Sequence, residues 1–208
     1  MKQDKSFLSV RQKIYLPFKR VVDIFLSFLA IVVFSPLYIV LAILVKCSSK
    51  GPIFFKQERR TKNGKVFKML KFRSMVVNAE AIGTGLFNYE NDPRVTKVGR
   101  FLRKTSIDEL PQLFNILIGQ MSFIGPRPAL WNQLELINER KNNHVDLLRP
   151  GLSGWAQCNG RDDIDLKQKI ALDTEYLHKF SIWFDIKIFF LSIERAIVGK
   201  DVIEGKQS

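Results

Sequence analysis

A long apolar segment near the N-terminus limits what this chain can fold into more than any other feature. About 22 uncharged and mostly apolar residues run from Ile24 to Val45, and a helix needs about 20 such residues to cross a bilayer. Ser35-Pro36 lies at the centre of the segment. Length alone therefore indicates a transmembrane helix, but one that carries a helix-breaking residue in its middle.

The charges on the two flanks argue against a simple span. Lysines and arginines precede the segment at Lys2, Lys5, Arg11, Lys13, Lys19 and Arg20, and follow it at Lys46, Lys50, Lys56, Arg59, Arg60 and Lys62. Basic residues beside a membrane helix favour the cytoplasmic side. Two basic flanks are therefore best accommodated when both ends of the segment lie in the cytoplasm.

Pro36 suggests how the segment could return to the side from which it came. Proline removes a backbone donor and clashes with an earlier carbonyl, while the hydroxyl of Ser35 can bond a backbone group that is released. We expect a re-entrant helix that enters the membrane, bends at Ser35-Pro36 and leaves by the same face. The alternative is an ordinary Pro-kinked span, which is tolerated where neighbouring groups repair the backbone.

Composition bounds the rest of the chain. Residues 51–208 are enough for one compact domain and too few for two, so we divide the chain into a membrane segment at 1–50 and a cytoplasmic domain at 51–208. The net charge is +13, with 33 Lys plus Arg against 20 Asp plus Glu. This charge implies an anionic partner, namely lipid headgroups, nucleic acid or a phosphorylated substrate. The 17 phenylalanines favour membrane lipids.

Several kinds of site are not expected. Cys47 and Cys158 have no paired spacing and His144 and His178 lie far apart, so we expect no zinc site. The sequence has no P-loop, no G-x-G-x-x-G and no recognised nucleic-acid motif, so we expect no nucleic-acid partner. The non-enzymatic alternative is a basic, membrane-tethered adaptor that binds anionic lipid or nucleic acid.

The pattern after the apolar segment predicts a mainly α-helical domain with one small β-hairpin. Residues 53–57 and 65–69 are typical of two strands, with Asn63-Gly64 in the turn between them. Residues 76–94 are polar and contain glycine, which predicts a loop. The helices are expected at 95–104, 109–118, 130–141, 165–180 and 182–198.

The last of these helices carries aromatic residues among lysine and arginine. Such an amphipathic helix suits a membrane interface. A helix packed in the core would show the same stripe, and residues 180–200 fit both descriptions.

Two adjacent carboxylates, Asp108 and Glu109, lie at the start of a predicted helix. Ser106 and Glu109 have the spacing of a capping box, but that register would place Pro111 where its missing N–H is needed. A helix that starts near Asp108 puts Pro111 in the tolerated first turn. Neighbouring helical side chains point about 100° apart, so the two carboxylates can serve two different roles.

Basic groups in constrained turns surround this pair in sequence. Arg103 precedes it, Pro126-Arg127-Pro128 follows it, and a third cluster runs from Arg149 to Arg161. Each arginine alone is more often a solvated charge. Several rigidly held guanidinium groups beside two carboxylates, however, are typical of a phosphate-binding active site.

An ordered set of motifs resembles the monotopic phosphoglycosyl transferases, the bacterial sugar transferase family, over nearly the whole chain. The motifs are Lys19-Arg20-x-x-Asp23, Ser35-Pro36, Gly51-Pro52, Phe55-x-Gln57-x-Arg59, Lys71-Phe72-Arg73-Ser74-Met75, Asp92-Pro93-Arg94-x-Thr96, Ser106 to Leu113, Met121 to Pro128 and Arg149 to Arg161.

This resemblance implies a fold and an activity. The enzyme would be monotopic, held at the bacterial inner membrane by its re-entrant helix and interfacial amphipathic helices, with its catalytic domain facing the cytoplasm. It would move a sugar-1-phosphate from a UDP-sugar to polyprenyl (undecaprenyl) phosphate, release UMP and require Mg²⁺. Such a reaction initiates capsule, O-antigen, exopolysaccharide or glycoprotein glycan assembly. The chain resembles the minimal form of the family, and it could act as a homodimer.

Roles for individual residues also follow from the resemblance. Asp108 would be the nucleophile that forms a covalent phosphosugar intermediate and would bind Mg²⁺, and Glu109 would be its partner. Arg103, Arg127 and Lys71 match positions expected near phosphates. Further phosphate-binding candidates in the third cluster are Arg149, Gln157 and Arg161. The stretches 127–133 and 160–163 resemble relatives that act on N-acetylated 6-deoxy sugars.

Overall fold

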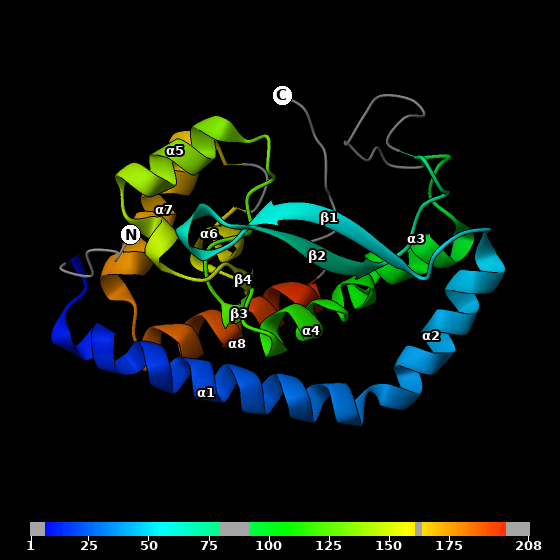
Figure 1. Cartoon of the computed structure of the whole chain (residues 1–208), viewed down its shortest axis with the longest axis horizontal. Coiled ribbons are helices and arrows are strands. Elements are labelled where there is room, and N and C mark those ends of the chain that lie inside the picture. Colours follow the sequence, from blue (N-terminus) through cyan, green and yellow to red (C-terminus); the bar gives the residue numbers. More distant parts are fainter. Residues whose placement is uncertain (1–6, 80–91, 161–163, 199–208) are drawn as a thin grey trace.

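The computed structural model describes residues 7–79, 92–160 and 164–198. Over these residues the protein is mainly helical and contains one antiparallel β-hairpin, as the sequence predicts (Figure 1). A short parallel pair of strands is a second sheet, which the sequence analysis does not anticipate. Most of the predicted loop at 76–94 lies outside the described residues.

The N-terminal segment forms two helices, α1 (Val10–Val33) and α2 (Ser35–Ser48). Ser9 caps α1 in a capping box with Gln12. The chain bends by 64° at the junction, where Pro36 occupies the first turn of α2 and the Ser35 hydroxyl donates to the Val32 carbonyl at 2.8 Å. The expected bend at Ser35-Pro36 is thus present.

The length of these helices matters for a membrane. Among the described residues no single helix is both long and apolar enough to cross a bilayer, whereas α1 and α2 together have that length and composition. Many of their apolar side chains are exposed, and Phe25, Phe28, Ile39 and Ile43 each leave more than half of their surface uncovered.

The hairpin consists of β1 (Phe54–Arg60) and β2 (Val66–Phe72), which pair from Phe54 with Phe72 to Arg60 with Val66. The turn η2 (Lys62–Gly64) contains Asn63 and Gly64 with φ of 63° and 66°, the left-handed conformation that these two residue types tolerate best. The predicted hairpin is confirmed, and both strands run further than expected. Phe67 and Met69 are buried on one face of β2, whereas Phe72 is buried on the other face in a separate core cluster.

The remaining helices follow the predicted order. They are α3 (Lys97–Lys104), η3 (Ile107–Glu109), α4 (Gln112–Leu117), α5 (Leu134–Asn142), η4 (Val145–Leu147), α6 (Trp155–Cys158), α7 (Leu166–Lys179) and α8 (Ile182–Val198). Short α6 and η4 were not expected. The predicted helix at 130–141 begins later, at Leu134, because the preceding residues form a turn in which the Leu130 N–H donates to the Gln133 side chain.

The second sheet joins two motifs that are far apart in sequence. Strands β3 (Ser122–Ile124) and β4 (Gly151–Ser153) pair in parallel. A Cβ atom on Gly151 would lie only 2.1 Å from the Gly125 nitrogen, so this close approach requires glycine. The pairing places the Pro-Arg-Pro turn beside the start of the third cluster.

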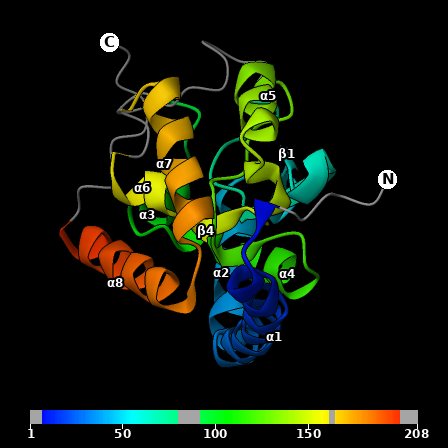
Figure 2. The same ribbon diagram turned by 90° about the vertical axis from the view of Figure 1, so that its left-hand side faces the viewer.

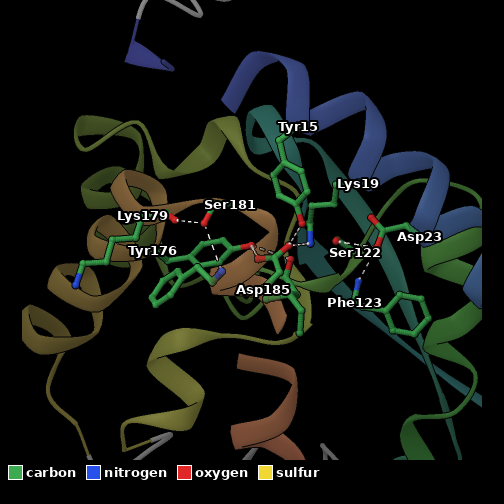
Figure 3. Close-up of polar contacts among 11 residues, drawn as sticks. Tyr15, Lys19, Asp23, Ser122, Phe123, Tyr176, Lys179, Ser181 and Asp185 are labelled. Carbon is green, nitrogen blue, oxygen red and sulfur yellow. Dashed lines mark hydrogen bonds and ion pairs between the residues drawn. The ribbon is translucent and has the colours of Figure 1, made fainter. Parts of the chain in front are cut away.

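Polar contacts fix α1 on the rest of the protein (Figure 3). Asp185 of α8 accepts hydrogen bonds from Tyr15 at 2.8 Å and from Tyr176 at 2.7 Å, and it pairs with Lys19 at 2.5 Å. Burial and the Asp185 carboxylate hold the pKa of Tyr176 well above its usual value, so this phenol stays a donor. Further along α1, Asp23 accepts from the Ser122 hydroxyl at 3.1 Å.

Helix α8 has two apolar faces. Ile188 is fully buried in a core cluster with Tyr176 and Phe180, whereas Trp183 and Phe190 are 78% and 64% exposed. Both views place α8 and α1 on the same side of the molecule, away from α5 (Figures 1 and 2). Within the described residues, one face of this helix is therefore packed in the core, and the placement of the other face in a membrane interface stays a prediction.

Candidate active site

The adjacent carboxylates lie in a tight turn between two helices. Ser106 adopts the left-handed conformation with φ of 55° and its side chain caps nothing, so no capping box forms. Asp108 and Glu109 belong to the 3₁₀ turn η3, and Pro111 is the N-cap of α4. The helical region thus begins near Asp108, as predicted. Three residues per turn separate neighbouring side chains by about 120°, which sends the two carboxylates in different directions.

Glu109 faces a basic depression on the surface. Its Oε1 accepts from the Lys71 Nζ at 2.7 Å, and both side chains retain about a fifth of their exposure. Lys71 comes from β2, which packs against η3. The depression is lined by Arg59, Met69, Lys71, Glu109, Gln112, Arg127, Pro128, Gly151 and Leu152. Two predicted phosphate-binding residues, Lys71 and Arg127, are thus brought together beside the carboxylate pair.

Asp108 is more enclosed than its neighbour. It retains 7% of its exposure and lies at the junction of α3, β2 and η3. The residues that line the depression include Glu109 but not Asp108. A carboxylate this buried is influenced by nearby protein groups more than by bulk water.

Arg103 approaches from the preceding helix. Its Nε donates to the Ser74 hydroxyl at 2.7 Å, just beyond the end of β2. Hydrogen bonds from Arg94, with a smaller contribution from the charge of Arg103, hold the pKa of Asp92 below its usual range. Arg103 therefore lies in a cationic region close to η3, although it does not line the depression.

Three other predicted residues are placed differently. The Arg149 Nε donates to the Gly119 carbonyl at 2.9 Å, and Arg149 lines a separate depression with Lys19 and Arg20. Arg149 thus lies just beyond the C-terminal end of α4 and is not among the residues that line the depression, and its role in phosphate binding stays a prediction. Gln157 donates to the carbonyl of Leu152, a lining residue, at 3.1 Å. Arg161 lies outside the described residues.

The structure adds two lining residues with polar side chains, Arg59 and Gln112, that the sequence analysis does not assign to the site. Arg59 receives support from Gln57, whose side-chain oxygen accepts from the Arg59 Nε at 3.0 Å. Gln112 is 3% exposed in the first turn of α4. A signal was present for Arg59, because residues two apart in a strand share a face and Gln57-x-Arg59 is such a pair.

The donor set for a metal ion is small. Among the described residues no cluster of three or more His, Cys, Asp or Glu side chains could hold a metal. Mg²⁺ in phosphate-handling sites is commonly bound through one or two carboxylates, with substrate oxygens and water completing its shell. The carboxylates of η3 fit that arrangement. Of the two, Asp108 is the ligand that the sequence resemblance predicts.

The charges of the depression suit an anionic ligand such as a phosphate group. Arg59 and Arg127 supply positive charge, and the fork of arginine matches phosphate oxygens. One carboxylate is neutralised by Lys71 and the other is enclosed beside it. The depression can therefore bind a phosphate group next to the segment that carries both carboxylates.

Comparisons with known proteins agree with this chemistry. A family model described as bacterial sugar transferase matches residues 14–199. The UDP-glucose:undecaprenyl-phosphate glucose-1-phosphate transferase of Escherichia coli (strain K12) is 43% identical over 190 residues, which are 88% of this chain and 40% of that protein. The UDP-N-acetylgalactosamine-undecaprenyl-phosphate N-acetylgalactosaminephosphotransferase of Aeromonas hydrophila is 41% identical over 191 residues, 89% of this chain and 45% of that protein.

A third relative has a length closer to that of this chain. The exopolysaccharide production protein ExoY of Rhizobium meliloti (strain 1021) is 40% identical over 196 residues, which cover 88% of this chain and 86% of that protein. By contrast, the chain spans less than half the length of the Escherichia coli and Aeromonas hydrophila relatives.

Proposed function

The chain belongs to the bacterial sugar transferase family, and from this premise we propose that it moves a sugar-1-phosphate from a UDP-sugar to polyprenyl phosphate and releases UMP. The observation that carries the proposal is the convergence of Lys71, Arg127 and Arg59 on a depression beside Asp108-Glu109. The names of the Escherichia coli and Aeromonas hydrophila relatives support both substrate classes. The product would start capsule, O-antigen, exopolysaccharide or glycoprotein glycan assembly.

The reaction proceeds in two displacements. A carboxylate oxygen of Asp108 attacks the phosphorus that bears the sugar, a new P–O bond forms, and the bond to the bridging oxygen breaks so that UMP leaves with the electron pair. An oxygen of polyprenyl phosphate then attacks the same phosphorus and breaks its bond to Asp108. Because the intermediate is covalent, the sugar nucleotide and the lipid need not be bound to the enzyme at the same time, and each displacement involves only one of them.

The basic groups make an attack of one anion on another feasible. Arg127 and Arg59 bind the diphosphate oxygens, and Arg103 adds positive potential from the α3 side. Lys71 neutralises Glu109 and holds it in one orientation, so that Glu109 does not repel the substrate. Asp108 would hold Mg²⁺, which would supply further charge neutralisation at the diphosphate.

The membrane geometry follows from the lipid substrate. Polyprenyl phosphate stays in the bilayer, so the site must lie at headgroup height. The bent pair α1–α2 enters the cytoplasmic leaflet of the inner membrane and returns, and the exposed aromatic face of α8 rests in the interface. The basic surface then contacts anionic lipid, and the catalytic domain faces the cytoplasm.

Trapping the intermediate tests the proposal most directly. Purified protein incubated with UDP-sugar and Mg²⁺, without lipid acceptor, should gain the mass of one sugar phosphate on the peptide that contains Asp108. Asp108→Asn should lose both turnover and adduct, because an amide of the same shape is not a nucleophile, and Glu109→Gln should be severely impaired. Glu135→Gln, an exposed carboxylate on α5, is the matched control and should behave as wild type.

Other results would separate parts of the proposal. An active Asp108→Asn enzyme, or an adduct on another residue, would reject the assigned nucleophile. UMP release only after both substrates bind would favour direct transfer without the covalent step. No UMP release from any UDP-sugar with polyprenyl phosphate would favour the adaptor alternative.

The sugar itself is proposed from sequence resemblance alone. The stretches 127–133 and 160–163 favour an N-acetylated 6-deoxy sugar, whereas the two named relatives act on glucose and N-acetylgalactosamine according to their names. A panel of UDP-sugars assayed for UMP release decides between them. Equal or faster turnover of UDP-glucose would reject the N-acetylated 6-deoxy sugar.

A further inference from the structure

The backbone of the Pro-Arg-Pro turn is held at every carbonyl. A turn with two prolines lacks two of its N–H groups and cannot pair as an ordinary strand, so its carbonyls need donors from elsewhere. Four consecutive carbonyls each accept a hydrogen bond. The Pro126 carbonyl accepts from the Gly151 N–H at 2.9 Å, and the Arg127 carbonyl accepts from Arg140 Nη1 at 2.7 Å. The Pro128 carbonyl accepts from Arg59 Nη1 at 2.8 Å, and the Ala129 carbonyl accepts from the Arg60 N–H at 2.9 Å.

Arg140 differs from the other three donors because it lies on a helix, whereas the other three lie on strands β1 and β4. It comes from α5, is 8% exposed, and gives its Nε and Nη2 to the Asp173 Oδ2 at 2.9 and 2.6 Å. Asp173 comes from α7 and is 1% exposed. One edge of the guanidinium is thus occupied by a carboxylate, and the remaining nitrogen points at the Arg127 carbonyl.

The surroundings of this ion pair are apolar. Leu136, Ala129 and Ile170 form a buried cluster between α5 and α7. Apolar residues of similar volume often stabilise such a contact as well as a buried ion pair does, because two charges must be removed from water. An apolar pair cannot, however, donate a hydrogen bond to a backbone carbonyl that receives none from its own segment.

We propose that Arg140, oriented by Asp173, is a positioning residue that fixes the Arg127 backbone and thereby the place of the Arg127 side chain at the substrate phosphates. The inference rests on the proposed function, in which Arg127 binds the diphosphate. Arg140 itself touches no substrate. Its effect is therefore transmitted through a single hydrogen bond of 2.7 Å.

The test must separate positioning from mere stability. Arg140→Met alone leaves a buried, unpaired carboxylate and is expected to unfold the protein. The double variant Arg140→Met/Asp173→Leu removes both charges, so we expect it to fold with a melting temperature close to that of wild type. Only the donor to the Arg127 carbonyl is then missing.

Uridine diphosphate (UDP) is the binding probe. Its affinity is measured by calorimetry on the full chain in nanodiscs, and KM and kcat for UDP-sugar are measured on the same samples. The double variant should bind UDP about tenfold more weakly and raise KM by a similar factor, with a smaller change in kcat, since a displacement of 1 Å can cost up to about a hundredfold. Arg127→Met should weaken binding in the wild-type background but by less than about twofold in the double-variant background, because coupled residues are not additive.

Several outcomes would overturn the proposal. These are a folded double variant with wild-type UDP affinity, an Arg127→Met effect of equal size in both backgrounds, or a double variant that fails to fold. A wild-type protein that neither binds UDP nor releases UMP would instead reject the proposed function. Measurements on the wild-type protein therefore distinguish a failure of the proposed function from a failure of the proposal for Arg140.

Discussion

Arg20 connects helix α1 to the segment that carries the carboxylate pair. Its Nη1 and Nη2 donate to the carbonyls of Ile116 and Leu117 at 2.6 and 2.7 Å, at the C-terminal end of α4. The last carbonyls of a helix have no partner within the helix, and a cation there is favourable. Asp108 and Glu109 precede the same short helix. We predict that Arg20→Met lowers both stability and turnover.

The size of the effect follows from the contacts. A hydrogen bond to a charged group contributes about 1.5–3 kcal/mol, and two are lost. The Ile116 carbonyl keeps the Gly119 N–H at 3.0 Å as a second donor, which favours the lower end of the range. A loss of about 3 kcal/mol corresponds to a melting temperature lower by about 6–12 °C for a chain of this length. Turnover should fall by about tenfold as Asp108 shifts.

The assay compares the thermal unfolding and UMP release of Arg20→Met with those of Arg11→Met. Arg11 lies on the same helix and is exposed, so it controls for the loss of one charge near the membrane. Arg20→Lys keeps the charge but cannot fork to two carbonyls, and should fall between the two. The reasoning is refuted if Arg20→Met melts within about 2 °C of wild type and turns over normally.

Two further predictions concern the membrane and acid stability. In a chain without Cys47 and Cys158, single cysteines placed at residues 10 and 60 should both be shielded from an impermeant thiol reagent added outside intact cells. Pro36→Ala should expose position 10 by restoring a straight helix. Labelling at position 10 in the protein that keeps Pro36 would instead indicate a transmembrane span. Arg94 lowers the pKa of Asp92, so this pair stabilises the fold above about pH 4 and the stabilisation is lost as pH falls through the lowered pKa. The melting temperature gap between wild type and Asp92→Asn should therefore narrow from pH 6 to pH 3, and a constant gap would contradict this account.

Local patterns account for the parts of the fold that were predicted. The Asn63-Gly64 turn and Ser35-Pro36 act through backbone conformation within a few residues, so the hairpin and the bend could be inferred directly. The parallel pairing of β3 with β4 could not. It depends on the close approach of Gly125 and Gly151, and two three-residue strands have no periodicity to detect.

The same distinction applies to the site. The carboxylate pair and Arg127 were predicted because they lie in constrained turns within recognisable motifs. The sequence does not reveal that Arg149 extends toward Gly119, since that direction is set by the packing of α4. The contact of Arg140 with the Arg127 carbonyl likewise depends on how α5 and α7 meet, which no local pattern specifies.

Helix α1 contacts both halves of the candidate site. Arg20 binds the end of α4, whose start follows Asp108-Glu109, and Asp23 binds Ser122 of β3, whose continuation contains Arg127. These two α1 residues are close in sequence, so a shift of α1 would move the carboxylate pair and the phosphate-binding turn together. Helix α1 is then part of the scaffold of the candidate site. If α1 enters the membrane as proposed, the depth of its insertion sets the position of the reacting carboxylate relative to the lipid phosphate.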